Sequence, residues 1–148
     1  MDDDSGEMWC RQDMQEDAPD ILITNYSMLN IMLMRYIESP IFEQTKVWLQ
    51  SNPKNIFHII IDELHTYRGT SGTEVAYILR ILLDRLGLSP NSPQVQYLSS
   101  SASMEDNVQT REYIGQFFGL TKDEVDSRFE LLGNPPSEKV VKPTVKLP

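Results

Sequence analysis

Cysteine and histidine are scarce in this sequence, which contains one cysteine, Cys10, and two histidines in 148 residues. A single cysteine cannot form an internal disulfide, and so few sulfur and imidazole ligands disfavour a structural zinc site. Long apolar runs are also missing: none approaches the roughly 18 residues of a membrane span, and the acidic amino-terminal segment lacks a signal peptide's basic region. We therefore expect a soluble, cytoplasmic protein without membrane contact.

Basic residues are few, because 13 Lys and Arg stand against 22 Asp and Glu, for a net charge of -9. Residues 1–20 contain eight of the acids and one base, Arg11, so -7 of this charge falls in that segment and -2 in the rest. An acidic segment repels a phosphate backbone, whereas nucleic-acid-binding domains usually carry a basic patch. DNA binding by this chain alone should therefore be weak.

The 40% of apolar residues can form the core of about one domain, for which roughly 100 to 200 residues is typical. Their pattern predicts both strands and helices. Strands are expected at residues 21–24, 57–62, 95–98 and 129–132. Helices are expected at residues 27–37, 41–49, 71–86 and 108–118, with a short one after residue 121. Strands that alternate with helices predict an α/β fold with a parallel sheet.

Three regions differ in composition. Residues 1–18 are acidic and have no apolar periodicity, which predicts a disordered lead-in. Residues 19–133 contain the expected domain, and the proline-containing residues 134–148 are expected to form an extended tail or linker.

The longest expected helix has the clearest start signal. Ser71 and Glu74 have the spacing of a capping box, which predicts that the helix begins at Ser71. Thr121 and Glu124 repeat this spacing before the short last helix. Apolar residues in the long helix recur at i, i+3 and i+4 and predict one buried face: Val75, Ile78, Leu79, Leu82, Leu83 and Leu86.

Polar residues follow three of the expected strands. They are Thr24 and Asn25, the segment 62–65 (Asp-Glu-Leu-His), and the segment 101–103 (Ser-Ala-Ser). In a parallel sheet, the carboxyl ends of the strands meet at one edge, where ligands bind. We therefore expect these three segments to converge on a functional site.

These segments resemble motifs of superfamily 2 DEAD/DEAH-box helicases. Residues 62–65 are similar to motif II, the Walker B element, and residues 101–103 are similar to motif III, usually Ser-Ala-Thr. Residues 20–29 resemble the segment before motif II that contacts the nucleic-acid strand. The longer string at residues 62–69, Asp-Glu-Leu-His-Thr-Tyr-Arg-Gly, is similar to one in large bacterial DNA helicases of DNA repair and phage defence.

The resemblance covers roughly residues 15–132 and implies part of a first RecA-like domain of the P-loop NTPase type. The expected sheet is parallel and lies between two helical layers, but it lacks the Walker A strand and loop. No Gly-x-x-x-x-Gly-Lys-Ser/Thr occurs in the sequence. The second RecA-like domain is also absent. We therefore expect a fragment of a larger helicase that is inactive alone and binds neither ATP nor Mg²⁺ tightly.

The resemblance also implies roles for individual residues in the complete, ATP- and magnesium-dependent enzyme. Asp62 would hold Mg²⁺ through its water shell, and Glu63 would be the base that activates water. His65 and the motif III residues would couple the nucleotide to the nucleic acid. These coupling residues are Ser101, Ala102 and Ser103.

DNA, single-stranded or duplex, would be the partner of the complete helicase. The implied contacts to the phosphates of one strand come from Thr24, Asn25 and Ser27, and such contacts carry little base information. Arg68 would join them or would pair with one of the two acids of motif II; the sequence leaves both possibilities open.

Two other functions are compatible with parts of the sequence. A decayed helicase domain could be a non-catalytic interaction module that binds a partner, or a second copy of itself, through an uncovered sheet edge. A small metal-dependent hydrolase could use Asp62, Glu63 and His65. Adjacent carboxylates on a strand point to opposite faces, which disfavours the hydrolase.

Overall fold

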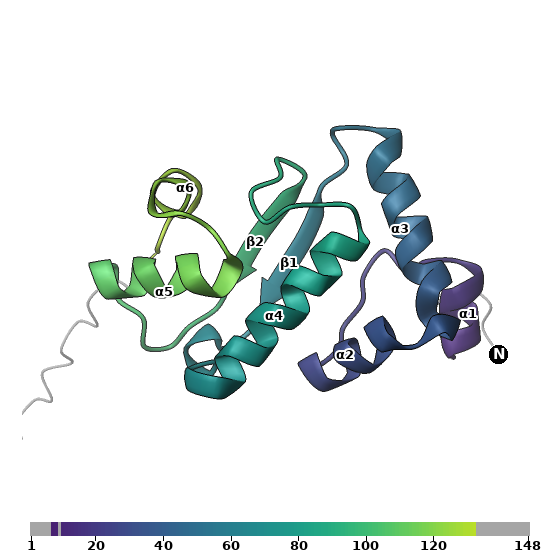
Figure 1. Cartoon of the computed structure of the whole chain (residues 1–148), viewed down its shortest axis with the longest axis horizontal. Helices are drawn as coiled ribbons and strands as arrows, with labels where there is room; N and C mark the ends of the chain where they lie inside the picture. Colours follow the sequence, from purple (N-terminus) through teal and green to yellow (C-terminus); the bar gives the residue numbers. More distant parts are fainter. Residues whose placement is uncertain (1–6, 9, 133–148) are drawn as a thin grey trace, which may run out of the picture.

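The structure, a computed structural model, describes residues 7–8 and 10–132 (Figure 1). Its elements are α-helices, two strands and two short 3-10 helices, η1 and η2, and helix α4 lies between the two strands in sequence. In chain order they are α1 (Arg11–Glu16), α2 (Tyr26–Met34), η1 (Tyr36–Glu38), α3 (Ser39–Ser51), β1 (Phe57–Ile61), η2 (Leu64–Thr66), α4 (Gly69–Arg85), β2 (Val95–Ser99), α5 (Val108–Phe118) and α6 (Lys122–Arg128). No helix among the described residues is both long and apolar enough to cross a bilayer.

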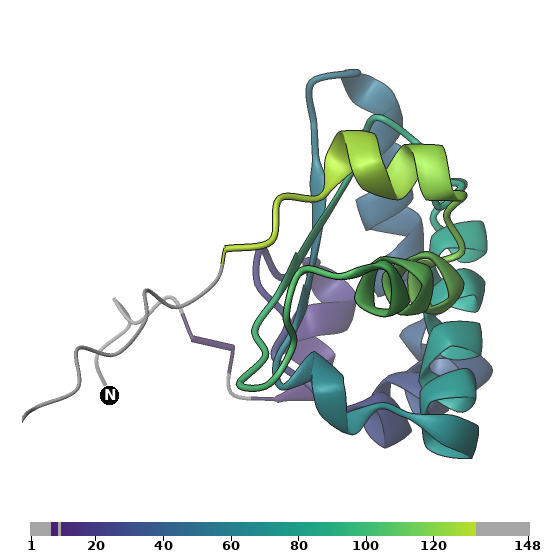
Figure 2. The same cartoon turned by 90° about the vertical axis from the view of Figure 1, so that its left-hand side faces the viewer.

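The two strands pair in parallel, with Phe57 opposite Val95 and Ile61 opposite Ser99. All helices lie on one side of this sheet, as the side view in Figure 2 shows. The described residues therefore form a mixed α/β fold of two layers, and the three layers predicted from the sequence are not found among them. The strands predicted at residues 57–62 and 95–98 are confirmed to within one residue at their ends.

The strand predicted at residues 21–24 is wrong. This segment forms no strand, and the side chains of Ile21 and Ile23 are 80% and 93% exposed. A strand needs a neighbour for its backbone hydrogen bonds, and among the described residues this segment has none. The strand predicted at residues 129–132 is also absent, because Phe129 instead stacks on Tyr97 and Phe118.

The predicted disordered lead-in contains a helix. Helix α1 lies against α3, and the amide of Ala18 donates to Gln44 Oε1 at 2.9 Å. Arg11 Nη1 lies 3.5 Å from Oε1 of the fully buried Glu38, and Arg35 Nη1 lies 3.9 Å from the same atom. A buried carboxylate is stable only beside opposite charge, so Glu38 provides a reason for α1 to dock. The predicted tail at residues 134–148 lies outside the described residues.

Helix α4 is the central helix of the helical layer and packs on two cores. The predicted buried face is confirmed, because all six of its apolar residues are buried. The predicted cap is wrong: α4 begins at Gly69, and the Ser71 hydroxyl donates to the Arg68 carbonyl oxygen at 3.1 Å. The capping box predicted at Thr121 and Glu124 is confirmed at the start of α6.

Each core uses a different set of α4 residues. One core lies between the sheet, α5 and α6 and contains Val75, Ala76, Leu79 and Leu83 of α4. The other lies between α2 and α3 and contains Ile78, Leu82 and Leu86. Because α4 contacts both cores, it holds the carboxyl end of β1 against the rest of the helical layer.

Candidate functional site

The carboxyl ends of β1 and β2 are joined beyond the last residue of each strand. The amide of Ser100 donates to the carbonyl oxygen of Ile61 at 3.0 Å, and the amide of Leu64 donates to that of Ser100 at 2.9 Å. These bonds hold the turn at residues 62–64 against the chain that leaves β2. The second predicted segment, residues 62–65, is therefore bonded to Ser100, the residue just before the third predicted segment, and the convergence of the segments on a functional site stays a prediction.

Asp62 and Glu63 are both exposed at this junction. The hydroxyl of Ser100 donates to Asp62 Oδ1 and accepts the amide of Glu63 at 3.0 Å. Ser100 precedes the predicted motif III. Its contact with Asp62 depends on the register of the two strands, which the sequence motif does not reveal.

The predicted coupling residues, 101–103, directly follow Ser100 in the chain but do not share its contacts with Asp62 and Glu63. The hydroxyl of Ser101 is buried and has no hydrogen-bond partner among the described residues. Ala102 and Ser103 are exposed. Among the described residues, none of the three forms a hydrogen bond with either carboxylate, although all three directly follow the junction.

Glu63 has a left-handed backbone, with a φ of 51°, and it alone does so among the described non-glycine residues. Such a conformation costs about 1 to 3 kcal/mol and persists where its surroundings determine it. The amide and hydroxyl of Thr66 both donate to the Glu63 carbonyl oxygen at 2.9 Å. The chain thus turns sharply out of β1 into η2, which leaves the Glu63 carboxylate in solvent.

His65 lies next to Glu63. Its Nδ1 atom is 3.1 Å from Glu63 Oε2, although the alignment falls short of a hydrogen bond. The two side chains can therefore pair by charge when the imidazole is protonated. Across the described ranges, no group of three His, Cys, Asp or Glu side chains could together hold a metal ion. The hydrolase interpretation, which needs such a group, has no support from this geometry.

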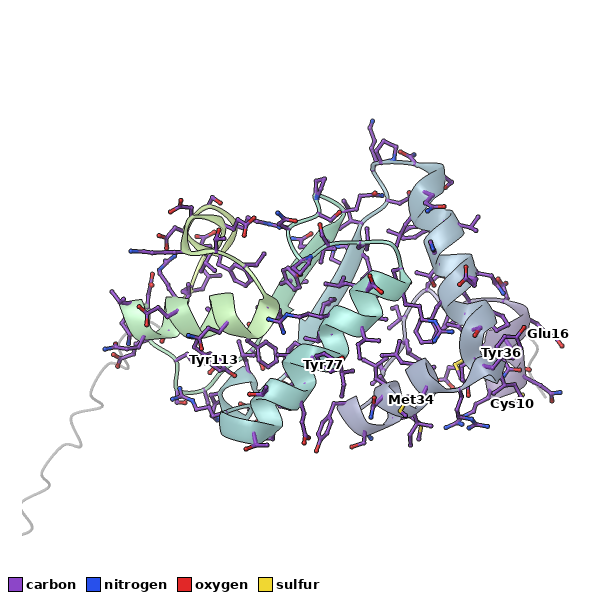
Figure 3. All side chains as sticks on the ribbon, in the orientation of Figure 1. Cys10, Glu16, Met34, Tyr36, Tyr77 and Tyr113 are labelled. Atoms are coloured by element: carbon purple, nitrogen blue, oxygen red, sulfur yellow. The ribbon has the colours of Figure 1, made fainter. Side chains whose placement is uncertain are left out.

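The loop between η2 and α4 is anchored on its far side by α5. The Tyr113 side chain comes from α5 (Figure 3). Its hydroxyl shares one proton between the carbonyl oxygen of Leu64, at 3.1 Å, and that of Tyr67. Burial raises the pKa of Tyr113 and so favours its donor form, while Arg68 partly opposes this shift. A Cβ atom on Gly72 would lie 2.2 Å from the Tyr67 carbonyl oxygen, so glycine permits the close packing of α4 on this loop.

Arg68 makes neither of the ion pairs considered for it: among the described residues, it bridges to no carboxylate. Its guanidinium instead lies 5.7 Å from the centre of the Tyr113 ring. A cleft of about 250 Å³ next to it contains Ser103, which brings a predicted coupling residue and a predicted phosphate contact together. The cleft is lined by Arg68, Ser103, Glu105, Asn107, Gln109, Thr110 and Tyr113.

The remaining predicted nucleic-acid contacts lie at the start of α2. Asn25 is its N-cap residue, and its side chain accepts the amide of Met28 at 2.8 Å. Thr24 and Ser27 are exposed. The Tyr26 ring meets the Tyr67 ring edge-on at 6.4 Å between centres, so this segment lies beside the loop that carries Arg68. Residues 21–25, which precede α2, have no regular secondary structure, so Thr24 and Asn25 do not follow a strand as predicted.

Together, the fold and the site define an α/β unit with two exposed carboxylates at the carboxyl end of a parallel strand pair. In sequence, the chain is 46% identical over 101 residues to the Druantia protein DruE of Escherichia coli (strain UMEA 4076-1), covering 68% of this chain and 6% of that protein. It is 28% identical over 129 residues to the uncharacterized ATP-dependent helicase MJ1574 of Methanocaldococcus jannaschii, covering 87% of this chain and 16% of that protein. The chain spans less than a fifth of either relative. No family model and no solved structure matches it.

Proposed function

We propose that this chain is the part of an ATP-dependent DNA helicase or translocase that carries the Walker B carboxylates and the coupling segment. The observation that carries the proposal is the placement of Asp62 and Glu63, exposed at the carboxyl end of β1 and bonded to the chain leaving β2. Similarity to a protein named as an ATP-dependent helicase supports it. The chain spans 6% and 16% of its relatives, which supports assigning motor activity, in this proposal, to a longer polypeptide.

Asp62 has the chemistry of a magnesium ligand. Mg²⁺ is usually held by one or two carboxylates, several waters and the phosphates of the substrate. One oxygen of Asp62 accepts the Ser100 hydroxyl, and the exposed carboxylate can still meet a hydrated ion. When bound, Mg²⁺ would offset the negative charge that develops on the transferred phosphate.

Glu63 would orient or deprotonate the attacking water. A general base must lie within hydrogen-bond reach of the water it activates, and the Glu63 carboxylate is exposed next to the proposed magnesium ligand. His65 Nδ1, 3.1 Å from Glu63 Oε2, would set the position of that carboxylate. His65 is therefore a positioning residue in this proposal.

Nucleic acid would bind on the side of Arg68. This exposed guanidinium shares one cleft with Ser103, so a phosphate bound there would lie next to the segment that follows β2. Thr24 and Ser27 are exposed beside the same loop and can donate to further phosphates. The Asn25 side chain caps α2 through Oδ1, so a contact from this residue to a phosphate would use its Nδ2 group or its backbone amide.

The natural polypeptide that contains these residues tests the magnesium role. We expect Asp62→Asn to reduce ATP turnover by about 100-fold or more and to raise the Mg²⁺ concentration needed for half-maximal rate. Asp84→Asn is the matched control, because Asp84 is an exposed acid on α4 away from the junction. Turnover by Asp62→Asn equal to that of the control would remove Asp62 from the mechanism.

The face of the β1–β2 sheet that no described helix covers, called the bare face below, favours a second candidate function. This candidate is an interaction module without catalysis. Ile60 is 72% exposed on the bare face, and Leu98, its partner across the strands, is also exposed. Exposed apolar surface of this kind is typical of association sites. For this second function, assembly would depend on Ile60, and both acids of the site could be replaced without effect.

A further inference from the structure

We propose that Ser100 is a positioning residue of the hydrolytic site, in which its hydroxyl fixes the carboxylate of Asp62 relative to the backbone of Glu63. This inference rests on the proposed function and adds a residue that the motif resemblance does not include. The observation behind it is a set of four hydrogen bonds between Ser100 and residues 61–64. No other residue after β2 makes such a set among the described residues.

The backbone of Ser100 determines where its hydroxyl lies. Its amide donates to the Ile61 carbonyl oxygen at 3.0 Å, and its carbonyl oxygen accepts the Leu64 amide at 2.9 Å. Both bonds extend the pairing of the parallel strands beyond their last residues. The hydroxyl is consequently held over the turn between β1 and η2 by the sheet itself.

The Ser100 hydroxyl forms one hydrogen bond as a donor, to the side chain of Asp62, and one as an acceptor, from the backbone of Glu63. A serine hydroxyl has one proton to donate, and here that proton goes to Asp62 Oδ1. Its oxygen accepts the Glu63 amide at 3.0 Å. One group therefore orients the proposed magnesium ligand and also supports the left-handed backbone of the proposed base.

This arrangement leaves the other oxygen of Asp62 for a cation. Within the described residues, Asp62 Oδ2 accepts no hydrogen bond, while Oδ1 accepts the one from Ser100. Groups that hold a metal ligand in place commonly change metal affinity or activity by about 10- to 100-fold when removed. We therefore expect Ser100 to act on the rate of hydrolysis and on the magnesium requirement more than on ATP binding.

Amide hydrogen exchange in this chain tests the contact without any assay of activity. In Ser100→Ala, the Glu63 amide should exchange about fivefold faster, because it loses its side-chain acceptor. The Leu64 amide, which bonds to the backbone of Ser100, should keep its rate. Ser100→Thr retains a hydroxyl and should restore the Glu63 rate. Ser99→Ala, which removes the adjacent hydroxyl, is the matched control. Equal Glu63 rates in both alanine variants would overturn the contact.

ATP turnover by the natural polypeptide tests the role. Ser100→Ala should lower kcat by about 10- to 100-fold, leave KM for ATP unchanged and raise the magnesium requirement, and Ser100→Thr should restore all three. If Ser100 had a purely structural role, Ser100→Ala would lower the stability of the protein without lowering kcat at an unchanged KM. Ser100→Ala kinetics equal to those of Ser99→Ala would overturn the inference alone, provided that Asp62→Asn abolishes turnover. Turnover insensitive to Asp62→Asn would overturn the proposed function, and the role of Ser100 with it.

Discussion

The two faces of the β1–β2 sheet differ sharply in burial, although both are formed by alternating residues of the same two strands. Ile59 is 6% exposed and packs under the helices, whereas its neighbour Ile60 is 72% exposed on the other side. The bare face also has His58 and Gln96, whose Nε2 and Oε1 atoms are 3.1 Å apart. A continuous apolar strand is typical of parallel sheets covered on both sides. The apolar run at residues 59–61 is therefore suited to two covered faces, although His58 precedes it, and the described residues cover one face.

The largest expected difference between the two faces is in stability. Ile59→Ala should lower the free energy of unfolding by about 2 to 5 kcal/mol, because it leaves a cavity in the core. Ile60→Ala removes the same atoms from solvent-exposed surface and should change stability by about 0.5 kcal/mol or less. Denaturant unfolding of both variants measures this contrast. Equal losses would show that the bare face is covered in solution.

The next expected effect is on association. We expect this chain to form dimers or larger species through the bare face, because it combines exposed apolar side chains with unpaired strand edges. Ile60→Lys should shift sedimentation velocity profiles toward the monomer. Val47→Lys, at an exposed apolar residue of α3, should have no such effect. A monomeric chain at all concentrations would contradict the expectation.

On the covered face, Tyr97 should make stability sensitive to alkaline pH. Burial raises the pKa of Tyr97 to about 12, and its hydroxyl donates to the Pro90 carbonyl oxygen at 2.8 Å. The folded-state pKa lies above the ordinary value of 10.0, so this contribution is fully present below pH 10 and is lost as pH rises toward 12. Tyr97→Phe should give a flatter stability curve over that interval. If stability fell equally with pH in Tyr97→Phe and in the unchanged chain, Tyr97 would not be the cause of the alkaline loss of stability.

The smallest expected effect concerns Glu124 on α6, which also packs over the covered side. The Thr121 amide donates to Glu124 Oε2 at 2.8 Å and lowers the pKa of this carboxyl. Since the folded-state pKa is below the ordinary value of 4.5, the stabilisation is present above pH 4.5 and is lost as pH falls through the folded-state pKa. Thermal unfolding of Glu124→Gln should therefore depend less on pH in this acidic range. An unchanged acid dependence would show that the cap contributes nothing measurable.

Local pattern predicted the helices better than the strands. The bounds of α5 match the prediction, because apolar spacing defines its buried face, Asn107 caps its start and Gly119 ends it with a φ of 76°. Residues 21–24 have a similar apolar run to β1, yet within the described part of the chain only β1 has a partner strand for its backbone. Strand pairing depends on residues far away in the sequence, so the run alone could not decide between the two outcomes. Helix α1 was missed for a related reason: its charged partner, Glu38, is distant in sequence.

The site could be predicted in position but not in all its contacts. The place of Asp62 and Glu63 follows from the end of an apolar strand, and the structure has them at the junction of the two strands. The contact of Ser100 with both acids depends on strand register, and the cation–π contact of Arg68 with Tyr113 depends on how α5 packs. Neither feature has a local sequence signal. The roles of these residues in hydrolysis stay predictions.

The role of Glu63 as the base in ATP hydrolysis is the central claim, and turnover by the natural polypeptide tests it most directly. Glu63→Gln keeps the size and the backbone contacts of this residue but removes its charge. We expect a loss of about 10²- to 10⁴-fold in kcat with ATP binding retained. Glu74→Gln, at an exposed acid of α4, should leave turnover unchanged. Full turnover by Glu63→Gln would contradict the account.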